Sequence, residues 1–303
     1  MTRSPDAVRR SVTDHLKAHA KATEQDHNTV KRRFVMSRFL VRVFTADPDR
    51  WILKGGVGMM VRLPESRYSR DIDLLTVPQD RDSDPITQLR IAVRDNHLDQ
   101  FRFELSEPLP LSNGKGSTVT VRALLGGKQF DAFSIDIVDA RRELIGAIEH
   151  QPAPRLIDND DFPGQARIAL YPLADQIADK ICACFERFGA GGTSSGRYRD
   201  LVDLLLVSMY LPIDLETTVA AVEAERAMRR IPSLPRTMQA PGPDWAVQWS
   251  KTAKKSPLAA EHHDLEAALA TARTCYDRIL ISVPAAATPH RWSPERRIWA
   301  PSQ

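Results

Sequence analysis

The fold is decided by two short stretches, Lys54-Gly55-Gly56 and Arg67-Tyr68-Ser69-Arg70-Asp71-Ile72-Asp73-Leu74-Leu75. An apolar run ends at the glycine pair, a short segment of helical character follows, and an Asp-x-Asp pair then lies inside a second apolar run. Alternate residues of a β-strand share a face, so Asp71 and Asp73 point the same way while Ile72 points into the core. The pattern therefore predicts a strand, a glycine turn, a helix, and a second strand that displays two carboxylates.

Two neighbouring carboxylates repel each other, and keeping both ionised requires a compensating cation. Hard divalent ions such as Mg²⁺ are bound by carboxylate oxygens together with substrate phosphates. We therefore interpret Asp71 and Asp73 as a metal site for phosphoryl transfer. An Asp-x-Asp pair on its own is also common at the polar end of a strand; the upstream glycine pair and the apolar flanks favour the functional interpretation.

The arrangement resembles the nucleotidyltransferase superfamily, whose signature is a Gly-Gly or Gly-Ser turn, an intervening helix and Asp-x-Asp on the next strand. The local form, KGG followed by RYSRDIDLL, looks more narrowly like the AbiEii/AbiGii toxins, the enzymatic halves of type IV toxin–antitoxin pairs. The resemblance covers about residues 50–210. It implies an α/β (α+β) fold, with a polymerase-β-like core built on a short mixed sheet, a helical N-terminal segment and a helical C-terminal domain.

The composition is that of a globular protein surrounded by water. A chain of 303 residues is long enough for a substantial core. No apolar run approaches the roughly 18 residues that span a bilayer, and the N-terminus lacks the hydrophobic core of a signal peptide. We interpret the three cysteines, Cys182, Cys184 and Cys275, as small buried side chains. These features predict a cytoplasmic protein that does not contact membranes.

Periodicity and composition divide the chain into four regions. We predict a helical N-terminal segment at 1–48, a nucleotidyltransferase core at 49–158, a helical C-terminal domain at 159–283 and a tail at 284–303. The core is expected to include a helix at 84–97. The proline-rich stretch 231–257 is predicted to be a loop, and the tail to be extended or disordered.

A third carboxylate that would complete a two-metal site is Asp136. Phe133, Ile135 and Ile137 share one face of the predicted strand, which leaves Asp136 on the other face. The resemblance places the superfamily's third aspartate at this position. The alternative is a structural, hydrogen-bonding aspartate. Asp131, at the start of the run, is expected at a turn or on the surface.

The second strong match to the family lies around Lys180, in a helix predicted at 172–188. Lys180 lies on the edge of an apolar stripe, and Arg187 repeats its position two turns later. Both side chains can keep their stems on the core and expose their charges. Helix geometry alone favours a surface lysine of this kind, but the AbiEii-type pattern also has a lysine in this helix. The resemblance thus implies a phosphate-binding role for Lys180, with Arg187 as added positive charge.

A glycine-rich loop at 189–196 leads into a helix that begins near Arg199. The family carries a basic-Asp-x-x-Asp-Leu motif here, and Asp200 is the matching position. A carboxylate close to Lys180 would orient the ammonium or help to activate the attacking hydroxyl. The alternative is an aspartate that complements the helix N-terminus. Asp203 is expected to pack or pair structurally.

The nucleotide phosphates are expected to be bound by residues around the glycine turn. Gly55 and Gly56 depart from the common Gly-Ser form, so backbone amides would do the work of the missing serine hydroxyl. Ser69 would restore a hydroxyl nearby. Arg67 or Arg70 would also reach phosphate, and Arg67 is favoured because the family form usually has a basic residue there.

The expected reaction is transfer of a nucleoside monophosphate from an NTP to an acceptor hydroxyl, with Mg²⁺ (or Mn²⁺) held by Asp71, Asp73 and Asp136. The resemblance implies an RNA 3′ end as acceptor, with tRNA as the leading candidate, a toxic block of translation, and a cognate antitoxin. Two alternatives remain open: nucleotidylylation of a small molecule or protein, and a non-catalytic nucleotide- or RNA-binding module.

Independent support for RNA comes from two groups of side chains. The first is a basic face of Lys31, Arg38 and Arg42 within a helical segment whose surrounding residues 1–50 carry 11 Lys+Arg against 6 Asp+Glu. The second is Trp245 and Trp249, which precede several lysines and could stack on unpaired bases. The alternative for the tryptophans, and the favoured one, is that they anchor the long loop to the core.

Overall fold

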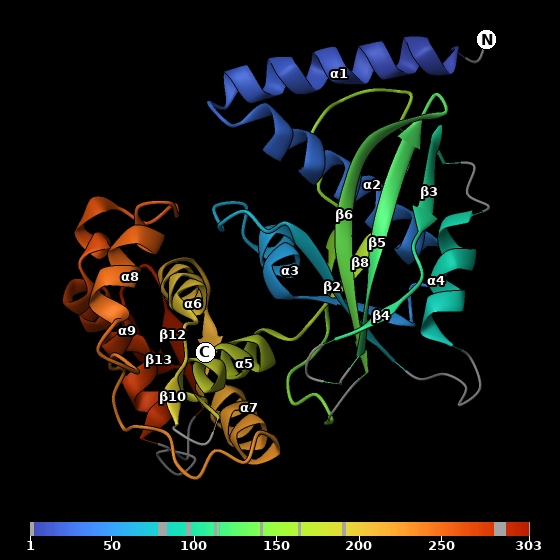
Figure 1. The fold of residues 1–303 in the computed structure, drawn as a ribbon. Helices are drawn as coiled ribbons and strands as arrows, with labels where there is room; N and C mark the ends of the chain where they lie inside the picture. The colour runs from blue at the N-terminus through green and yellow to red at the C-terminus, as the bar shows by residue number, and fades with distance from the viewer. Residues whose placement is uncertain are drawn as a thin grey trace. The chain divides into compact units, whose positions relative to one another are not determined.

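The computed structural model describes residues 3–77, 84–94, 98–111, 114, 116–139, 142–162, 165–189, 192–281 and 289–302. The chain forms two compact units (Figure 1). The first comprises Met1–Arg62, Tyr68–Ala140 and Glu149–Leu170; the second comprises Leu63–Arg67, Arg141–Ile148 and Tyr171–Gln303. The mixed α/β architecture predicted from the sequence is confirmed. Among the described residues, no helix is long and apolar enough to cross a membrane.

The first unit is built on a mixed sheet with strand order β3-β5-β6-β2-β1-β8-β7, in which β4 also pairs with β5. The pairs β2–β6 and β1–β8 are parallel, and the other neighbouring pairs are antiparallel. The strands are β1 (Trp51–Lys54), β2 (Asp71–Thr76), β3 (Phe101–Leu105), β4 (Leu109–Pro110), β5 (Gly116–Leu125), β6 (Lys128–Asp139), β7 (Glu149–Pro152) and β8 (Arg167–Leu170).

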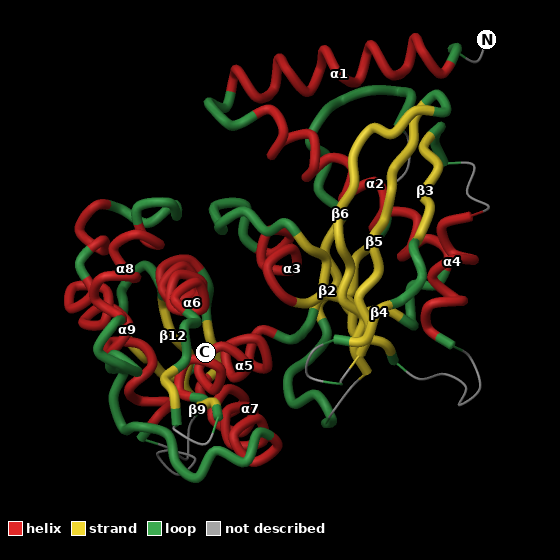
Figure 2. The backbone as a smooth tube through the Cα atoms, viewed as in Figure 1, coloured by secondary structure: helices red, strands yellow, loops and turns green. Residues whose placement is uncertain are grey.

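Helices cover one face of this sheet and leave much of the other open. The helices are α1 (Pro5–Ala22), α2 (His27–Ala46), α3 (Gly55–Arg62) and α4 (Pro85–Arg94). In Figure 2, α2 passes behind the strands and α4 lies beside β3. Phe39 of α2 packs edge-on against Phe103 of β3 and Phe133 of β6, so the alternation of apolar residues in these strands is explained by their burial under α2. Residues 95–97, included in the predicted helix, lie outside the described residues.

The sheet extends past the limit of the core proposed from the sequence. Strand β8 lies beyond residue 158, yet it pairs in parallel with β1 through Leu53 and Leu170. Ile168 and Leu170 are fully buried. The sequence did not predict that β8 belongs to this sheet, because a long irregular stretch precedes it.

The predicted basic face of α2 is wrong for two of its three residues. Arg38 and Arg42 are buried and both pair with Asp99, at 2.8 and 2.5 Å. Arg42 also donates to the carbonyl of Phe101, 2.6 Å away. A buried guanidinium needs an opposite charge to compensate for the loss of water. Asp99 supplies that charge, so these arginines hold the segment before β3 and are not presented to a ligand. Lys31 lies over the ring of Phe130.

The second unit is mainly helical. Its helices are α5 (Leu173–Phe185), α6 (Tyr198–Tyr210), α7 (Leu215–Met228), α8 (Trp245–Ala253) and α9 (Leu265–Leu280), with a 3₁₀ turn at Ala260–His263. Two small antiparallel sheets accompany them. These are β9 (Arg187–Phe188) with β10 (Thr193–Ser194), and β11 (Ile213–Asp214) with β12 (His290–Ser293) and β13 (Ile298–Pro301).

One sequence prediction for this unit is wrong, and two alternatives left open by the sequence are decided by the structure. The proline-rich stretch contains the helix α8, whose Trp245 and Trp249 are buried and donate indole N–H bonds to the carbonyls of Ser195 and His262. The anchoring alternative for these tryptophans is therefore correct. For the tail, the extended alternative is correct where the chain is described. Strands β12 and β13 form a hairpin, in which Trp292 is buried and donates to the carbonyl of Ser208.

Candidate active site

The glycine turn is shaped around the side chain of Asp73. Gly55 follows the last residue of β1 and begins α3 with a φ of +65°, a conformation that favours glycine. A Cβ on Gly55 would collide with the Oδ2 and Cγ atoms of Asp73. Gly55 is therefore required both for the turn and for the space that the carboxylate occupies. Gly56 follows as a buried residue of α3.

The three predicted carboxylates lie on one open face of the first unit. Asp73 of β2 is directly opposite Asp136 of β6, and Asp71 is opposite Ser134. Ile72 and Leu74, which alternate with the aspartates, are fully buried, whereas Asp71 is exposed and Asp73 and Asp136 are partly exposed. Parallel pairing thus brings Asp136 beside Asp73, although 62 residues (136 − 73 − 1) lie between them in the chain.

The row of residues that contains Asp73 continues to both sides. Lys54 of β1 is the cross-strand neighbour of Asp73, and Thr118 of β5 is the cross-strand neighbour of Asp136. The order Lys54, Asp73, Asp136, Thr118 thus crosses four strands. Because Lys54 adjoins the carboxylates, this row carries both signs of charge. Lys54 belongs to the stretch that predicts the turn, but no role was predicted for its side chain, although its place next to the glycine pair was a usable signal.

This donor set fits a hard divalent cation. All three side chains supply carboxylate oxygens, which Mg²⁺ and Mn²⁺ accept. Within the part of the chain that the structure describes, no three His, Cys, Asp or Glu side chains are gathered into a ready metal cage. Mg²⁺ in phosphoryl-transfer sites is commonly held by one or two carboxylates plus substrate phosphates, rather than by a dedicated protein cage. The neighbouring pair Asp73 and Asp136 meets that lesser requirement.

A second polar group lies near the start of β2. Arg32 of α2 pairs with Asp131 of β6 through Nη2 and Oδ1, 2.7 Å apart. Asp131 is buried, so its expected turn or surface position is wrong. Tyr68 lies close to this pair: burial raises the pKa of its phenol, and Arg32 opposes that rise. Ser69 is partly exposed in the same loop, and its backbone N–H contacts the sulfur of Met60.

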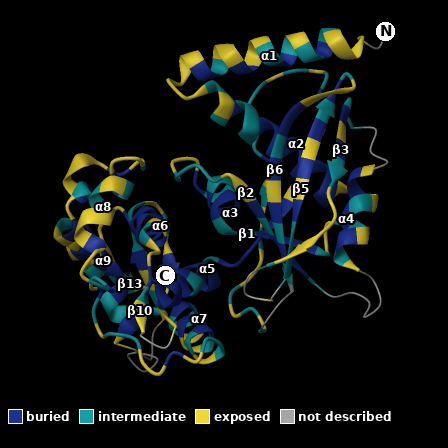
Figure 3. Ribbon diagram, viewed as in Figure 1, coloured by how far each residue is buried: buried dark blue, intermediate teal, exposed yellow. Residues whose placement is uncertain are grey.

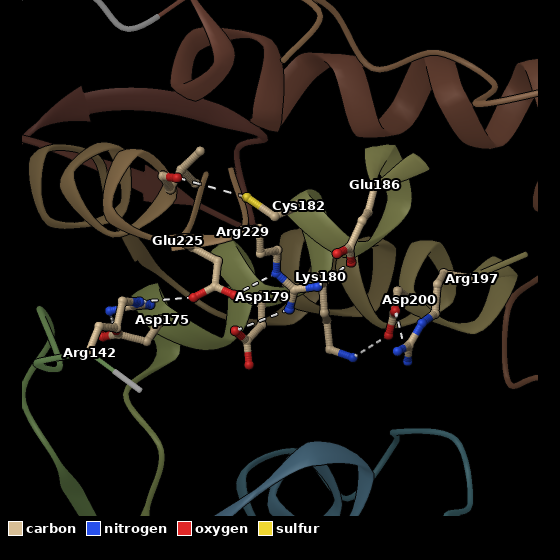
Figure 4. A network of polar contacts seen from close by, with 11 residues as sticks. Arg142, Asp175, Asp179, Lys180, Cys182, Glu186, Arg197, Asp200, Glu225 and Arg229 are labelled. Carbon is tan, nitrogen blue, oxygen red and sulfur yellow. Dashed lines mark hydrogen bonds and ion pairs between the residues drawn. The ribbon is translucent and has the colours of Figure 1, made fainter. Parts of the chain in front are cut away.

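In the second unit, Lys180 is buried and not on the surface. Its ammonium donates to Asp200 Oδ1 at 3.0 Å and to Asp203 Oδ2 at 2.5 Å. Figure 4 shows Lys180 pointing from α5 toward Asp200 at the start of α6. Asp200 and Asp203 are one helical turn apart and therefore share a face of α6. Burial by itself lowers the pKa of Lys180, but the charges of Asp200 and Asp203 outweigh it and raise the pKa above its ordinary value.

Arg67 belongs to the same cluster. Its guanidinium forms an ion pair with Asp203, with Nε 2.8 Å from Oδ1. Arg67 is thus held by a buried carboxylate, and Asp203, expected to pair structurally, has two cationic partners. The cluster has two cations and two carboxylates, Arg67, Lys180, Asp200 and Asp203. The Arg67–Asp203 pair was not predictable from local patterns, because its members are 136 positions apart in the chain.

Arg187 does not share a helical face with Lys180. Helix α5 ends at Phe185, and Arg187 lies on β9, where its side chain is exposed. The neighbouring Phe188 is 47% exposed, so it does not continue the apolar stripe. The glycine-rich segment folds the chain back as the β9–β10 hairpin, which is why the helix stops early.

A larger polar network lies along the other side of α5 (Figure 4). Asp175 is fully buried and accepts from Arg142, at 2.5 Å, and from the backbone N–H of Gly146, at 2.8 Å. Arg142 also pairs with Glu225, which pairs in turn with Arg229. Each buried charge has an opposite partner, so this network fastens residues 142–146 to α5 and α7.

Comparison with known proteins supports the family, the fold class and the enzyme class expected from the sequence. A family model described as nucleotidyl transferase AbiEii toxin, type IV TA system, matches residues 38–271. The structure is similar to that of the nucleotidyltransferase toxin MenT4 from Mycobacterium tuberculosis, with a TM-score of 0.54, 17% sequence identity, and 95% of this chain and 92% of that chain covered.

A further similar structure is JHP933 from Helicobacter pylori, with a TM-score of 0.46, 14% identity, and 85% and 91% of the two chains covered. The comparison with curated proteins gives no significant match. The MenT4 likeness supports the fold, and the family model, which spans well over half of the chain, supports the family and enzyme class that the sequence predicted. The chain belongs to the AbiEii family of nucleotidyltransferase toxins of type IV toxin–antitoxin systems.

Proposed function

We propose that the protein transfers a nucleoside monophosphate from an NTP to the 3′-terminal hydroxyl of an RNA, most favourably tRNA, in a reaction that depends on Mg²⁺ or Mn²⁺. The observation that carries the proposal is the set of three aspartates on the open face of the β2–β6 pair, beside a glycine turn that fits Asp73. In the transfer, the acceptor oxygen forms a bond to the α-phosphorus, the bond from that phosphorus to the bridging oxygen breaks, and pyrophosphate leaves as the hydroxyl proton is released.

The residues of the first unit have distinct roles in this proposal. Asp71, Asp73 and Asp136 hold the divalent ion, which when bound neutralises phosphate charge and lowers the pKa of the attacking hydroxyl. Gly55 keeps the Asp73 carboxylate in place, and the amides at Gly55 and Gly56 together with Ser69 bind phosphate oxygens. Lys54 balances the charge of the adjacent aspartates.

Residues of the second unit also contribute. Lys180 supplies a positive charge for phosphate, and Asp200 orients its ammonium, which the 3.0 Å hydrogen bond supports. Asp203 holds Lys180 and Arg67 together. Arg67 and the exposed Arg187 add positive charge for phosphate. Because Lys180 is buried, its loss affects folding as well as catalysis, and the two effects must be measured separately.

The biological outcome follows from the acceptor. A tRNA extended at its 3′ end no longer accepts an amino acid, so translation stops and the cell ceases to grow. The toxin–antitoxin family also implies a cognate antitoxin that relieves this toxicity. We propose that the protein acts in the cytoplasm, where NTP and tRNA are available.

The test is incubation of the purified protein with Mg²⁺, total RNA and each of four α-³²P-labelled nucleotides in turn. We expect one nucleotide to label a band of tRNA size. Asp71→Asn and Asp73→Asn should each lower the rate by about 100-fold or more, while EDTA should abolish it. Asp158→Asn is the matched control, because Asp158 is a highly exposed aspartate of the same unit.

The label identifies the acceptor. Label on protein, or on a small molecule and not on RNA, would contradict the RNA acceptor while keeping nucleotidyl transfer. Unchanged rates in both aspartate variants would contradict the carboxylate site itself.

A further inference from the structure

The open face of the first sheet continues from the carboxylates to two exposed arginines. Arg102 of β3 and Arg122 of β5 both pair with Glu104 of β3, and Arg122 is directly opposite Glu104. The arginine side chains remain 72% and 60% exposed, and Glu104 is 29% exposed. The triad therefore has a net charge of +1 and guanidinium groups that a ligand can reach.

Uncharged hydroxyl groups lie between this triad and the carboxylates. Thr120 of β5 pairs with Ser134 of β6, which pairs in turn with Asp71 of β2. Thr120 and Ser134 are exposed, and Thr118 lies beside Asp136. The alternation of buried and exposed residues along β5 and β6 is visible in Figure 3. A polar strip thus runs from the arginines to the aspartates on one surface.

Stability alone gives little reason for the arginine triad. Exposed ion pairs contribute a median of about 0–1 kcal/mol, and opposite charges across strands add only a few tenths to about 1 kcal/mol. Arginine is, by contrast, well suited to phosphate, because its planar guanidinium binds two oxygens at once. Hydroxyl side chains bind sugar and phosphate oxygens without adding negative charge.

We propose that this strip, Arg102, Arg122, Thr120 and Ser134, binds the single-stranded 3′ end of the nucleic-acid acceptor and leads its terminal hydroxyl to Asp136. The inference rests on the proposed function and specifies where its acceptor binds. Two observations favour a polynucleotide: the positive charge of the triad complements phosphate, and the strip is continuous with the carboxylate face.

Strand geometry fixes which part of the acceptor meets the arginines. Arg122 and Thr118 are four residues apart on β5, which corresponds to about 14 Å at about 3.4 Å per residue. This length accommodates a few nucleotides. The arginines therefore contact phosphates upstream of the terminal nucleotide, and an acceptor with a single unpaired nucleotide does not reach them.

Glu104 gives the proposal a distinctive signature. Its carboxylate competes with phosphate for both guanidinium groups, and the Arg102 hydrogen bond chiefly lowers its pKa, so it is ionised at neutral pH. Glu104→Gln should free both arginines and tighten RNA binding. Arg102→Gln with Arg122→Gln should weaken it. If the triad only stabilised the sheet, both Glu104→Gln and the double arginine variant would weaken RNA binding.

The experiment measures binding of a fluorescent single-stranded RNA to the full-length protein by anisotropy, without NTP, over a range of salt. The double arginine variant should raise Kd by roughly tenfold and reduce the slope of log K against log salt by about 1.4, since each phosphate contact contributes about 0.7 for single strands. Arg90→Gln is the matched control, because Arg90 is an arginine of α4 that likewise pairs with an exposed glutamate.

Turnover distinguishes the two proposals. In the transfer assay the double variant should raise the KM for RNA and leave the KM for NTP unchanged. Suppose that the wild-type protein transfers nucleotide to RNA, but the double variant binds RNA as tightly as the wild type, or Glu104→Gln binds RNA more weakly. Either result would overturn the proposed RNA-binding strip and leave the proposed function standing. Binding that follows the expected order without any transfer to RNA would support the strip and refute the proposed function.

Discussion

Gly55 shows how one missing Cβ determines the site. Its φ of +65° turns the chain from β1 into α3, and its open Cα gives room to the carboxylate of Asp73. A residue with a side chain would meet both a backbone cost and a collision. The glycine is therefore part of the site, and its effect on activity is separable from its effect on folding.

We predict that Gly55→Ala abolishes transfer activity, because the new Cβ displaces the Asp73 carboxylate. Gly127→Ala is the matched control: Gly127 also has a positive φ, of +71°, but nothing lies within 4 Å of an added Cβ. Both variants should lose about 1 kcal/mol of unfolding free energy from the left-handed backbone. Only Gly55→Ala should lose about 100-fold or more in transfer rate. Equal activity in the two variants would contradict this role for Gly55.

Lys180 is the other residue whose environment decides its effect. We predict that Lys180→Met lowers the unfolding free energy by about 3–5 kcal/mol, since it leaves the carboxylates of Asp200 and Asp203 without their shared ammonium. Arg197→Gln is the control, because Arg197 is 61% exposed and its ion pair with Asp200 is long, at 3.9 Å. This substitution should change the unfolding free energy by no more than about 0.5 kcal/mol.

Urea denaturation measures the stability, and activity per folded molecule measures the catalytic effect. If Lys180 binds phosphate, Lys180→Met should have lower activity per folded molecule even without urea, where most of the protein is folded. Full activity per folded molecule would assign Lys180 a structural role alone.

At the scale of elements, periodicity located helices better than their ends. The predicted apolar stripe is found in α5, but the helix ends at Phe185 because the following residues form the β9–β10 hairpin. In α2 the predicted cationic face turned inward, since Asp99 supplies a buried partner for Arg38 and Arg42. Local periodicity does not reveal such distant partners.

The C-terminal hairpin is an element that depends on one buried side chain. We predict that Trp292→Ala destabilises the protein by about 3–5 kcal/mol, since it empties a buried site and leaves the carbonyl of Ser208 without its indole donor. Arg291→Ala, the neighbouring exposed position on β12, is the control and should have little effect. Thermal unfolding followed by circular dichroism measures both. An unchanged melting temperature for Trp292→Ala would show that the hairpin does not stabilise the fold.

At the scale of the molecule, the chain crosses between its two units more than once. Residues 63–67 and 141–148 belong to the second unit, although the segments beside them build the first. The three cysteines of the chain, Cys182, Cys184 and Cys275, are all buried in the second unit. Thiol chemistry therefore reports on that unit selectively.

We predict that the second unit loses stability above pH 9. Burial raises the pKa of Cys182 from its ordinary value of 9.0 to about 12. The folded state thus keeps the thiol protonated while the unfolded state releases its proton, so the stabilisation is full below pH 9 and is lost as the pH rises toward 12. Urea midpoints at pH 8 and pH 10.5 measure this loss, with thiol labelling to follow unfolding. Cys182→Ala should show a smaller decline; an identical decline would contradict the assignment to Cys182.

The strand positions of the three aspartates were predictable because their signals are local. The alternation around Asp71, Asp73 and Asp136 requires only the two-residue repeat of a strand, and the glycine pair marks a turn. The partners of Arg38, Arg67 and Asp131 were not predictable, because ion pairs between distant segments leave no periodic trace. The buried hairpin at Trp292 was missed for the same reason, since a short strand without clear alternation resembles an irregular tail.

The sequence by itself determined the strand–turn–helix–strand unit, the shared face of Asp71 and Asp73, and the family to which these motifs belong. Those properties arise from steric rules that act over a few residues. Only the tertiary structure decided that Asp136 lies opposite Asp73, that Lys180 is buried between Asp200 and Asp203, and that an arginine-bearing strip continues the carboxylate face. Strand register and burial depend on the packing of segments far apart in the chain, and local sequence does not encode them.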